Sequence, residues 1–175
     1  MAKEFSFDIV SDFDIQEMVN AIDQTKREVL TRYDFKGTDP QIEFDEDKKG
    51  LILNVSDDYK LTAVLDIIKQ KMVKRGLSLK ILDESVPKEE ASGGRVRKKV
   101  PFKKGLNQED AKKINRIIRE VYPKVKPNIQ GDTIRVSANS KDDLQSVMQL
   151  LKEEPLINIP LQFTNYRWII NIVII

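Results

Sequence analysis

The sequence contains no cysteine and no histidine. Without cysteine, the chain cannot form disulfides, thiolate nucleophiles, iron–sulfur clusters or zinc–thiolate sites. Without histidine, it lacks a Ser-His-Asp triad, imidazole metal ligands and the commonest general base near neutral pH. An enzyme built from this sequence would have to rely on Asp, Glu, Lys or Tyr. The composition therefore favours binding over catalysis, and we expect no cofactor.

Targeting and membrane-spanning segments are not indicated either. Residues 1–10 do not combine a charged region with a long apolar run, as a signal peptide does. The longest apolar-rich stretch, Trp168–Ile175, has eight residues, whereas a membrane-spanning helix needs about 20. Walker-type glycine loops and the pattern G-x-G-x-x-G are missing as well. These absences predict a soluble, intracellular protein with no membrane partner, and they leave ATP hydrolysis and dinucleotide redox chemistry without support in the sequence.

Charge is unevenly distributed along the 175 residues, of which 40% are hydrophobic, as in a globular chain. The formal net charge is +2, but residues 1–94 carry −6, residues 95–126 carry +9 and residues 127–175 carry −1. A basic middle segment of this kind predicts a positive surface patch and an anionic partner.

Hydrophobic periodicity predicts the same order of elements twice. The first half is predicted to contain a strand at 5–9, a helix at 15–29 capped by Ser11 or Asp12, and a hairpin of strands at 41–46 and 51–56. A helix at 58–76, begun by Asp57 or Asp58, and a last strand at 79–82 follow. Pro87–Gly94 reads as a linker. The second half repeats the order, with Ser140 as a helix cap (residues 95–104, 108–121, 128–130 with 133–138, 142–153 and 161–166).

Residue identities support an internal duplication. Leu61–Ile68 aligns with Leu144–Leu151 at an offset of 83 residues, and the same offset places the strand 51–55 over 134–138. Two separate elements that share one offset indicate a repeat. The expected fold is α+β, with two tandem ferredoxin-like βαββαβ repeats. Each repeat would be a four-stranded antiparallel sheet with two helices on one face.

Seven short motifs lie in a fixed order along the chain. They are SFDIVS at 6–11, RYDFKG at 32–37, KRG at 74–76, KKG at 103–105, IQGDTIRVS at 129–137, KDDLQ at 141–145 and FTNYR at 163–167. In this order, over about residues 5–167, the chain resembles the YajQ family of bacterial nucleotide-binding proteins.

The resemblance implies that the repeats exchange their N-terminal strands, so that Phe5–Val10 joins the second sheet and Arg95–Lys104 joins the first. The expected domains are then residues 11–104, and residues 1–10 together with 105–167. The tail, residues 168–175, departs from the family pattern, which ends near Arg167. It is either a strand that docks on a partner or membrane, or a non-native C-terminus without function.

The resemblance further implies a cytoplasmic, non-enzymatic protein that binds a nucleotide such as cyclic di-GMP, GTP or ATP. Such a protein would act through nucleotide-dependent interaction with a protein partner, for example a transcription regulator. The alternative is an RNA-binding module, for tRNA or another RNA, that contacts phosphates through a basic strand and helix. A phosphoryl-transfer or phosphate-ester enzyme is a third alternative.

The strand expected at residues 95–104 is the first candidate for phosphate binding, because arginine and lysine are the usual phosphate ligands. Alternation places four basic side chains on one face: Arg95, Arg97, Lys99 and Lys103. Other basic residues in or after this strand are Lys98, Lys104, Lys112, Lys113, Arg116 and Arg119. The alternative interpretation is a solvated edge strand whose charges prevent edge pairing.

The segment Arg32–Gly37 is the second candidate, because an aromatic ring there would stack on a base while the basic residues hold phosphate. The alternative is that Tyr33 or Phe35 packs in the core. The open sheet positions Ile52, Asn54, Arg135 and Ser137 include no aromatic residue, so stacking of the RRM type is not expected. The predicted nucleotide or phosphate contacts, with no catalytic or metal site, are Arg32, Phe35, Lys36, Arg95, Arg97, Lys99, Lys103, Lys104, Lys113 and Arg116.

Overall fold

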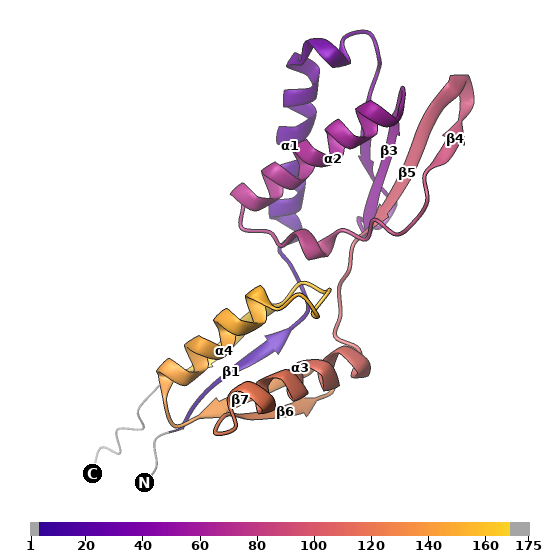
Figure 1. The fold of residues 1–175 in the computed structure, drawn as a ribbon. Helices are drawn as coiled ribbons and strands as arrows, with labels where there is room; N and C mark the ends of the chain where they lie inside the picture. The colour runs from indigo at the N-terminus through magenta and orange to yellow at the C-terminus, as the bar shows by residue number, and fades with distance from the viewer. Residues whose placement is uncertain (1–3, 169–175) are drawn as a thin grey trace. The chain divides into compact units, whose positions relative to one another are not determined.

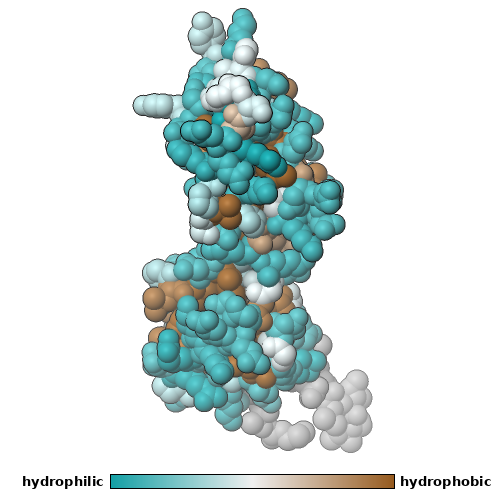
Figure 2. Space-filling view, turned by 90° about the vertical axis from the view of Figure 1, so that its right-hand side faces the viewer, coloured by the Kyte–Doolittle hydropathy of each residue, from teal (hydrophilic) through white to brown (hydrophobic). Residues whose placement is uncertain are grey.

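The computed structural model describes residues 4–168, which form two compact units (Figure 1). Unit 1 contains the chain up to Asp12 and again from Lys104 onward, and unit 2 is Phe13–Lys103. The surface seen in Figure 2 is mostly hydrophilic over both units, and hydrophobic side chains show only in smaller areas. Residues 169–175 of the predicted tail lie outside the described residues.

Unit 2 is an antiparallel sheet with two helices on one face (Figure 1). Its strand order is β2-β3-β5-β4, with β2 at Gln41–Phe44, β3 at Gly50–Val55, β5 at Arg95–Pro101 and β4 at Glu89–Ala91. The helices are α1 (Ile15–Thr31) and α2 (Asp58–Lys74). Apolar residues from both helices and from alternate strand positions form its core, which leaves the other face of the sheet open.

Unit 1 repeats this architecture with its own core. Its strand order is β6-β7-β1-β8, with β6 at Lys126–Gln130, β7 at Thr133–Ala138, β1 at Phe5–Val10 and β8 at Gln162–Arg167. The helices are α3 (Gln108–Val121) and α4 (Lys141–Glu153). Phe7, Ile9 and Ile134 are among its fully buried residues. The fold therefore consists of two ferredoxin-like units, as the sequence predicts.

The exchange of strands between the repeats is confirmed. β1 pairs with β7 in the register Phe7↔Val136 and with β8 on its other side. β5 pairs with β3 in the register Leu51↔Val100 and with β4 on its other side. The exchanged strand is thus an inner strand of each sheet, hydrogen-bonded along both edges.

Polar caps fix where the helices begin. Ser140 and Asp57 cap α4 and α2 as expected, accepting from the amides of Asp143 and Lys60. The expectation for α1 is wrong by two residues or more, because Asp14 is the cap and its carboxylate accepts from the Gln16 amide at 2.9 Å.

The last strand of unit 2 is misplaced by the sequence prediction. Leu79–Ile81 is a 3-10 turn capped by Ser78, whose hydroxyl accepts from the Lys80 amide. The fourth strand is β4, which lies within the segment taken as a linker. Two glutamates and an alanine carry no apolar alternation, so this short edge strand gives no periodic signal.

Candidate functional site

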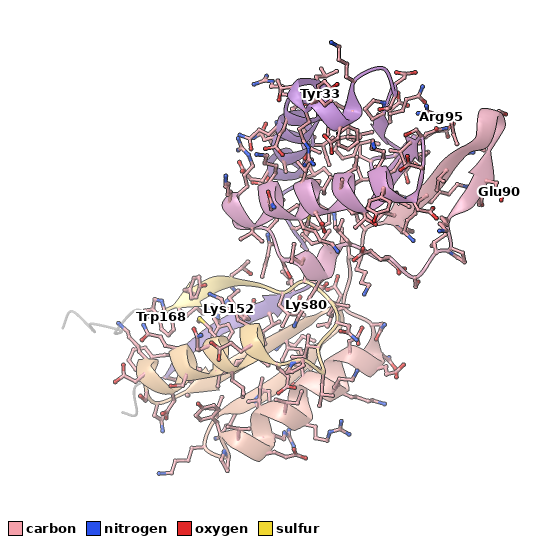
Figure 3. The ribbon with its side chains drawn as sticks, turned by 45° about the horizontal axis from the view of Figure 1, so that its top comes forward. Tyr33, Lys80, Glu90, Arg95, Lys152 and Trp168 are labelled. Carbon is pink, nitrogen blue, oxygen red and sulfur yellow. The ribbon has the colours of Figure 1, made fainter. Side chains whose placement is uncertain are left out.

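The open face of the unit 2 sheet carries a groove of about 670 Å³. Two of the residues that line it, Glu90 and Arg95, are labelled in Figure 3. The strand registers place two rows of side chains across this face. One row is Gln41–Asn54–Arg97–Glu89, and the other is Glu43–Ile52–Lys99. The groove is lined by all of these residues except Lys99, and also by Asp39 and Arg95. Cations, amides and carboxylates therefore meet on one helix-free surface.

Arg95 is engaged with the protein itself. Its Nε donates to Asn54 Oδ1 at 2.7 Å, and its Nη1 and Nη2 donate to the carbonyls of Thr38, Asp39 and Asn54 at 2.5–3.1 Å. These bonds join the start of β5 to the loop before β2. The guanidinium predicted to contact a phosphate is therefore occupied by four neutral acceptors, and its first role is to position this loop.

Arg97 and Lys99 are the cations of this face that keep their donors available. Within residues 4–168, neither side chain makes a hydrogen bond or an ion pair. Lys99 is exposed, and Arg97 is partly exposed between Asn54 and Glu89 of the neighbouring strands. These two residues hold the positions that the sequence predicts for a phosphate-binding face.

Lys98 and Lys103 serve elsewhere in unit 2. Lys98 Nζ donates to the carbonyls of Glu84 and Val86 at 3.1 and 2.6 Å, which explains how a lysine fits on the core side of β5. Lys103 lies beyond β5, and its amide donates to the Ile81 carbonyl at 2.7 Å. Hydrogen bonds from the Ser85 hydroxyl and amide, together with the charges of Lys103 and Lys98, hold the pKa of Asp83 below its usual value.

The Arg32–Gly37 segment is divided between surface and core. Phe35 is only 3% exposed and belongs to the unit 2 core, so its ring is closed to a base in this conformation. Tyr33 is 89% exposed. Arg32 makes a bidentate pair with Asp34, which raises the pKa of Arg32 and lowers that of Asp34. Lys36 is exposed.

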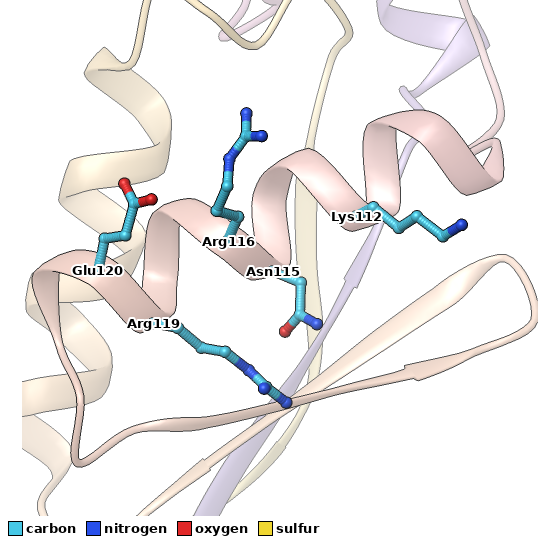
Figure 4. Close-up of a pocket in the computed structure, with 5 residues that line it drawn as sticks. All are labelled: Lys112, Asn115, Arg116, Arg119 and Glu120. Atoms are coloured by element: carbon cyan, nitrogen blue, oxygen red, sulfur yellow. The ribbon is translucent and has the colours of Figure 1, made fainter.

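The remaining predicted contacts belong to unit 1 and do not lie on the unit 2 groove. Lys104 pairs with Asp12 at 3.3 Å, and Lys113 Nζ donates to the Leu156 carbonyl at 3.3 Å. Arg116 is exposed on α3 in a shallow depression of about 360 Å³ (Figure 4). The residues that line this depression are Lys112, Asn115, Arg116, Arg119 and Glu120.

On the equivalent face of the unit 1 sheet, a charged residue is already paired within the protein. Arg135 Nε donates to Asp8 Oδ1 at 3.1 Å, and Asn165 Nδ2 donates to Asp8 Oδ2 at 2.8 Å. Asp8 is 8% exposed; burial alone would raise its pKa, but the hydrogen bonds from Arg135 and Asn165 outweigh burial and hold the pKa below its usual value. The duplication and the strand registers put Asp8 at the position of Lys99. The two units therefore differ in whether this charge is already neutralised.

Comparison with known proteins agrees with the motif order. The family model described as "Nucleotide-binding protein YajQ-like" matches residues 5–167. This chain belongs to the YajQ-like family. A nucleotide-binding protein of Trichodesmium erythraeum is 53% identical over 167 residues, covering 95% of this chain and 100% of the relative. Nucleotide-binding proteins of Thermosynechococcus vestitus and Chloroflexus aurantiacus are 51% and 50% identical, with the same coverage.

Membership in the YajQ-like family makes this a nucleotide-binding protein. None of the helices in residues 4–168 is both long enough and apolar enough to cross a membrane. Sequence reasoning had not found Glu89 and Gln41 as lining residues of the unit 2 groove. Gln41 could have been placed by strand alternation, whereas Glu89 lies in the short strand that carries no periodic signal.

Proposed function

We propose that the nucleotide binds on the open face of the unit 2 sheet, with a phosphate held by Arg97 and Lys99. The observation that carries this proposal is that both cations lack partners among the described residues, while the equivalent Asp8 of unit 1 is paired. A guanidinium offers two parallel hydrogen bonds to phosphate and an ammonium adds a compact charge. An external anion would neutralise Lys99 in unit 2, as Arg135 neutralises the equivalent Asp8 in unit 1.

The groove beside these cations favours a guanine nucleotide, with cyclic di-GMP or GTP as the best candidates. Its volume of about 670 Å³ lies within the roughly 300–1,000 Å³ usual for small-molecule sites. The carboxylates of Glu43 and Glu89 are acceptors, and guanine presents adjacent N–H donors on its pairing edge. ATP would offer a single exocyclic donor group to the same acceptors.

The proposed mode of action is interaction with a partner, without catalysis, in the cytoplasm. Arg95 ties the loop that follows Tyr33 to the rim of the groove. A bound phosphate next to Arg97 offers Arg95 a charged acceptor, and charge-assisted bonds are about twice as strong as bonds between neutral groups. Nucleotide binding would in this way change how the loop is presented to a protein partner such as a transcription regulator.

Calorimetric titration of the full chain with cyclic di-GMP, GTP and ATP tests this proposal. We expect saturable binding that is lost in Arg97→Glu with Lys99→Glu. The matched control is Lys26→Glu with Arg27→Glu, which makes the same change of net charge on exposed α1 positions of the same unit. If the groove variant binds nucleotide as well as the control does, the placement of the site is wrong.

RNA is the second candidate ligand, because α3 presents basic side chains at helical spacing. Lys112, Arg116 and Arg119 are exposed and make no hydrogen bond or ion pair in the part of the chain that the structure describes. Residues three and four apart share one face of a helix. Binding of RNA would weaken steeply with salt, since each phosphate contact releases counterions. Salt-insensitive nucleotide binding without RNA binding would contradict this second candidate.

A further inference from the structure

A further pocket, in unit 1, lies at the position equivalent to the one that the Arg95 guanidinium occupies in unit 2. It has a volume of about 300 Å³ and is lined by Glu4, Lys124, Lys126, Ser137, Ala138 and Asn139. The registers Lys126↔Ser137 and Gln41↔Asn54 make these two pairs equivalent under the duplication. Counting along the paired strands then puts Glu4 at the position of Arg95.

The charges of the side chains at these two equivalent positions are reversed. In unit 2 the cation comes from the inner strand, and Arg95 reaches across to carbonyls beside Asp39. In unit 1 the equivalent residue is Glu4, which directly precedes β1, and the cations are Lys124, next to β6, and Lys126, in β6. Both lysines are exposed, and neither makes a hydrogen bond or ion pair within residues 4–168, not even with Glu4. The position that the Arg95 guanidinium occupies in unit 2 therefore corresponds, in unit 1, to a pocket lined by two unpaired ammonium groups.

We propose that this pocket binds the phosphate group of a small phosphate monoester. Two ammonium groups supply the charge, and the Ser137 hydroxyl and Asn139 amide supply hydrogen-bond donors for phosphate oxygens. A volume of about 300 Å³ is at the lower end of small-molecule sites, which suits a mononucleotide or free phosphate better than a cyclic dinucleotide. The inference concerns unit 1 and does not depend on the proposed nucleotide site of unit 2.

Glu4 makes the proposal specific, because a carboxylate on the wall of the pocket opposes a bound dianion. Removing the Glu4 charge is therefore expected to change the phosphate affinity in the opposite direction to removing the lysine charges. Glu4→Gln keeps the size of the side chain and is expected to tighten phosphate binding severalfold. Lys124→Glu with Lys126→Glu is expected to weaken binding by about tenfold or more, because like charges would then face the phosphate.

The test is NMR titration of the ¹⁵N-labelled full chain carrying Arg97→Glu and Lys99→Glu, which removes the proposed unit 2 site. The probes are inorganic phosphate, adenosine monophosphate and, as a probe without phosphate, adenosine. We expect saturable shifts of the Lys126, Ser137 and Asn139 amide signals with both phosphate compounds and none with adenosine. Saturation by inorganic phosphate alone would identify a phosphate-ion site, whereas tighter binding of the monophosphate would identify a nucleotide site; both outcomes support the inference.

Three outcomes would overturn it. The first is that these amide signals do not move with either phosphate compound. The second is that Lys26→Glu with Arg27→Glu weakens binding as much as the change at 124 and 126, which would reduce the effect to net charge. The third is that the signals respond only to a short RNA, with a steep dependence on salt, which would make the lysines part of an RNA surface.

Discussion

The Arg95 guanidinium and the Thr38 carbonyl lie 2.8 Å apart although 57 positions separate the two residues in the chain. The same guanidinium also bonds Asp39 and Asn54, so one side chain connects the loop before β2 with β3 and β5. Its neighbour on the same face, Arg97, makes no such bond among the described residues. Two arginines two residues apart thus have different roles, one in the fold and one open to a ligand.

This difference predicts unequal effects on stability. Arg95→Ala removes four hydrogen bonds, three of them partly buried, and is expected to lower the free energy of unfolding by about 1–3 kcal/mol. Arg97→Ala removes no bond to any described residue and should change the free energy of unfolding by less than about 0.5 kcal/mol. Urea denaturation of both variants measures the contrast. Equal losses would show that the bonds of Arg95 do not stabilise the unit.

Substitutions of the two aromatic residues in the Arg32–Gly37 segment should also differ in their effect on stability. Phe35→Ala empties a core position and is expected to cost about 3–5 kcal/mol of unfolding free energy. Tyr33→Ala should stay within about 0.5 kcal/mol because the ring is exposed. Thermal or urea unfolding checks stability, and nucleotide titration of Tyr33→Ala checks whether the exposed ring stacks on a base. A mild effect of Phe35→Ala would contradict its place in the core.

Asp8 predicts a pH dependence of stability. Its pKa in the folded protein lies below the ordinary value of 3.8 because of Arg135 and Asn165. The carboxylate therefore stabilises the fold fully above the unfolded pKa, and this contribution is lost as the pH falls from about 4 through the lower folded pKa.

Unfolding free energies measured between pH 2 and 6 should fall more steeply with acid in the original protein than in Asp8→Asn. Asp83→Asn is a useful comparison, because it removes another carboxylate of lowered pKa from unit 2 while leaving the Asp8 pair intact. Parallel acid profiles for the original protein and Asp8→Asn would show that the pair adds no pH-dependent stability.

Gly50 controls the approach of β3 to β5. A Cβ atom at this position would lie 2.9 Å from Pro101 Cα and 2.9 Å from the Val100 carbonyl oxygen, both backbone atoms that cannot move aside easily. Gly50→Ala should therefore destabilise unit 2 by about 1–3 kcal/mol through overpacking. Hydrogen exchange of the β3–β5 amides would locate the effect, and unchanged protection there would contradict it.

The general architecture could be predicted because it depends on local patterns. Helical spacing and alternation placed α2, α3 and β7 closely, and the repeated offset of 83 residues showed the duplication. The exchange of β1 and β5 could not be read from periodicity, since either partner sheet would accept the same alternating strand. It followed from the family resemblance.

The candidate site was only partly predictable for a related reason. Arg95, Arg97 and Lys99 alternate correctly on β5, but the acceptors that occupy Arg95 come from Thr38, Asp39 and Asn54, far away in the sequence. A charge count cannot distinguish a cation that is bonded within the fold from one that is free. The opposite charges of Glu4 and Arg95 likewise become meaningful only when the strand registers show that the two positions are equivalent.

The exchanged strands also dictate the order in which the chain can fold as it is synthesised. Unit 2 is one uninterrupted stretch, Phe13–Lys103, and can complete its sheet as soon as β5 has been made. β1 is made first, yet its partners β7 and β8 begin at Thr133 and Gln162. The earliest strand therefore stays unpaired until β7 has been made, and its second edge stays unpaired until β8 follows. Until then, a ribosome-bound nascent chain would carry a finished unit 2 and an incomplete unit 1.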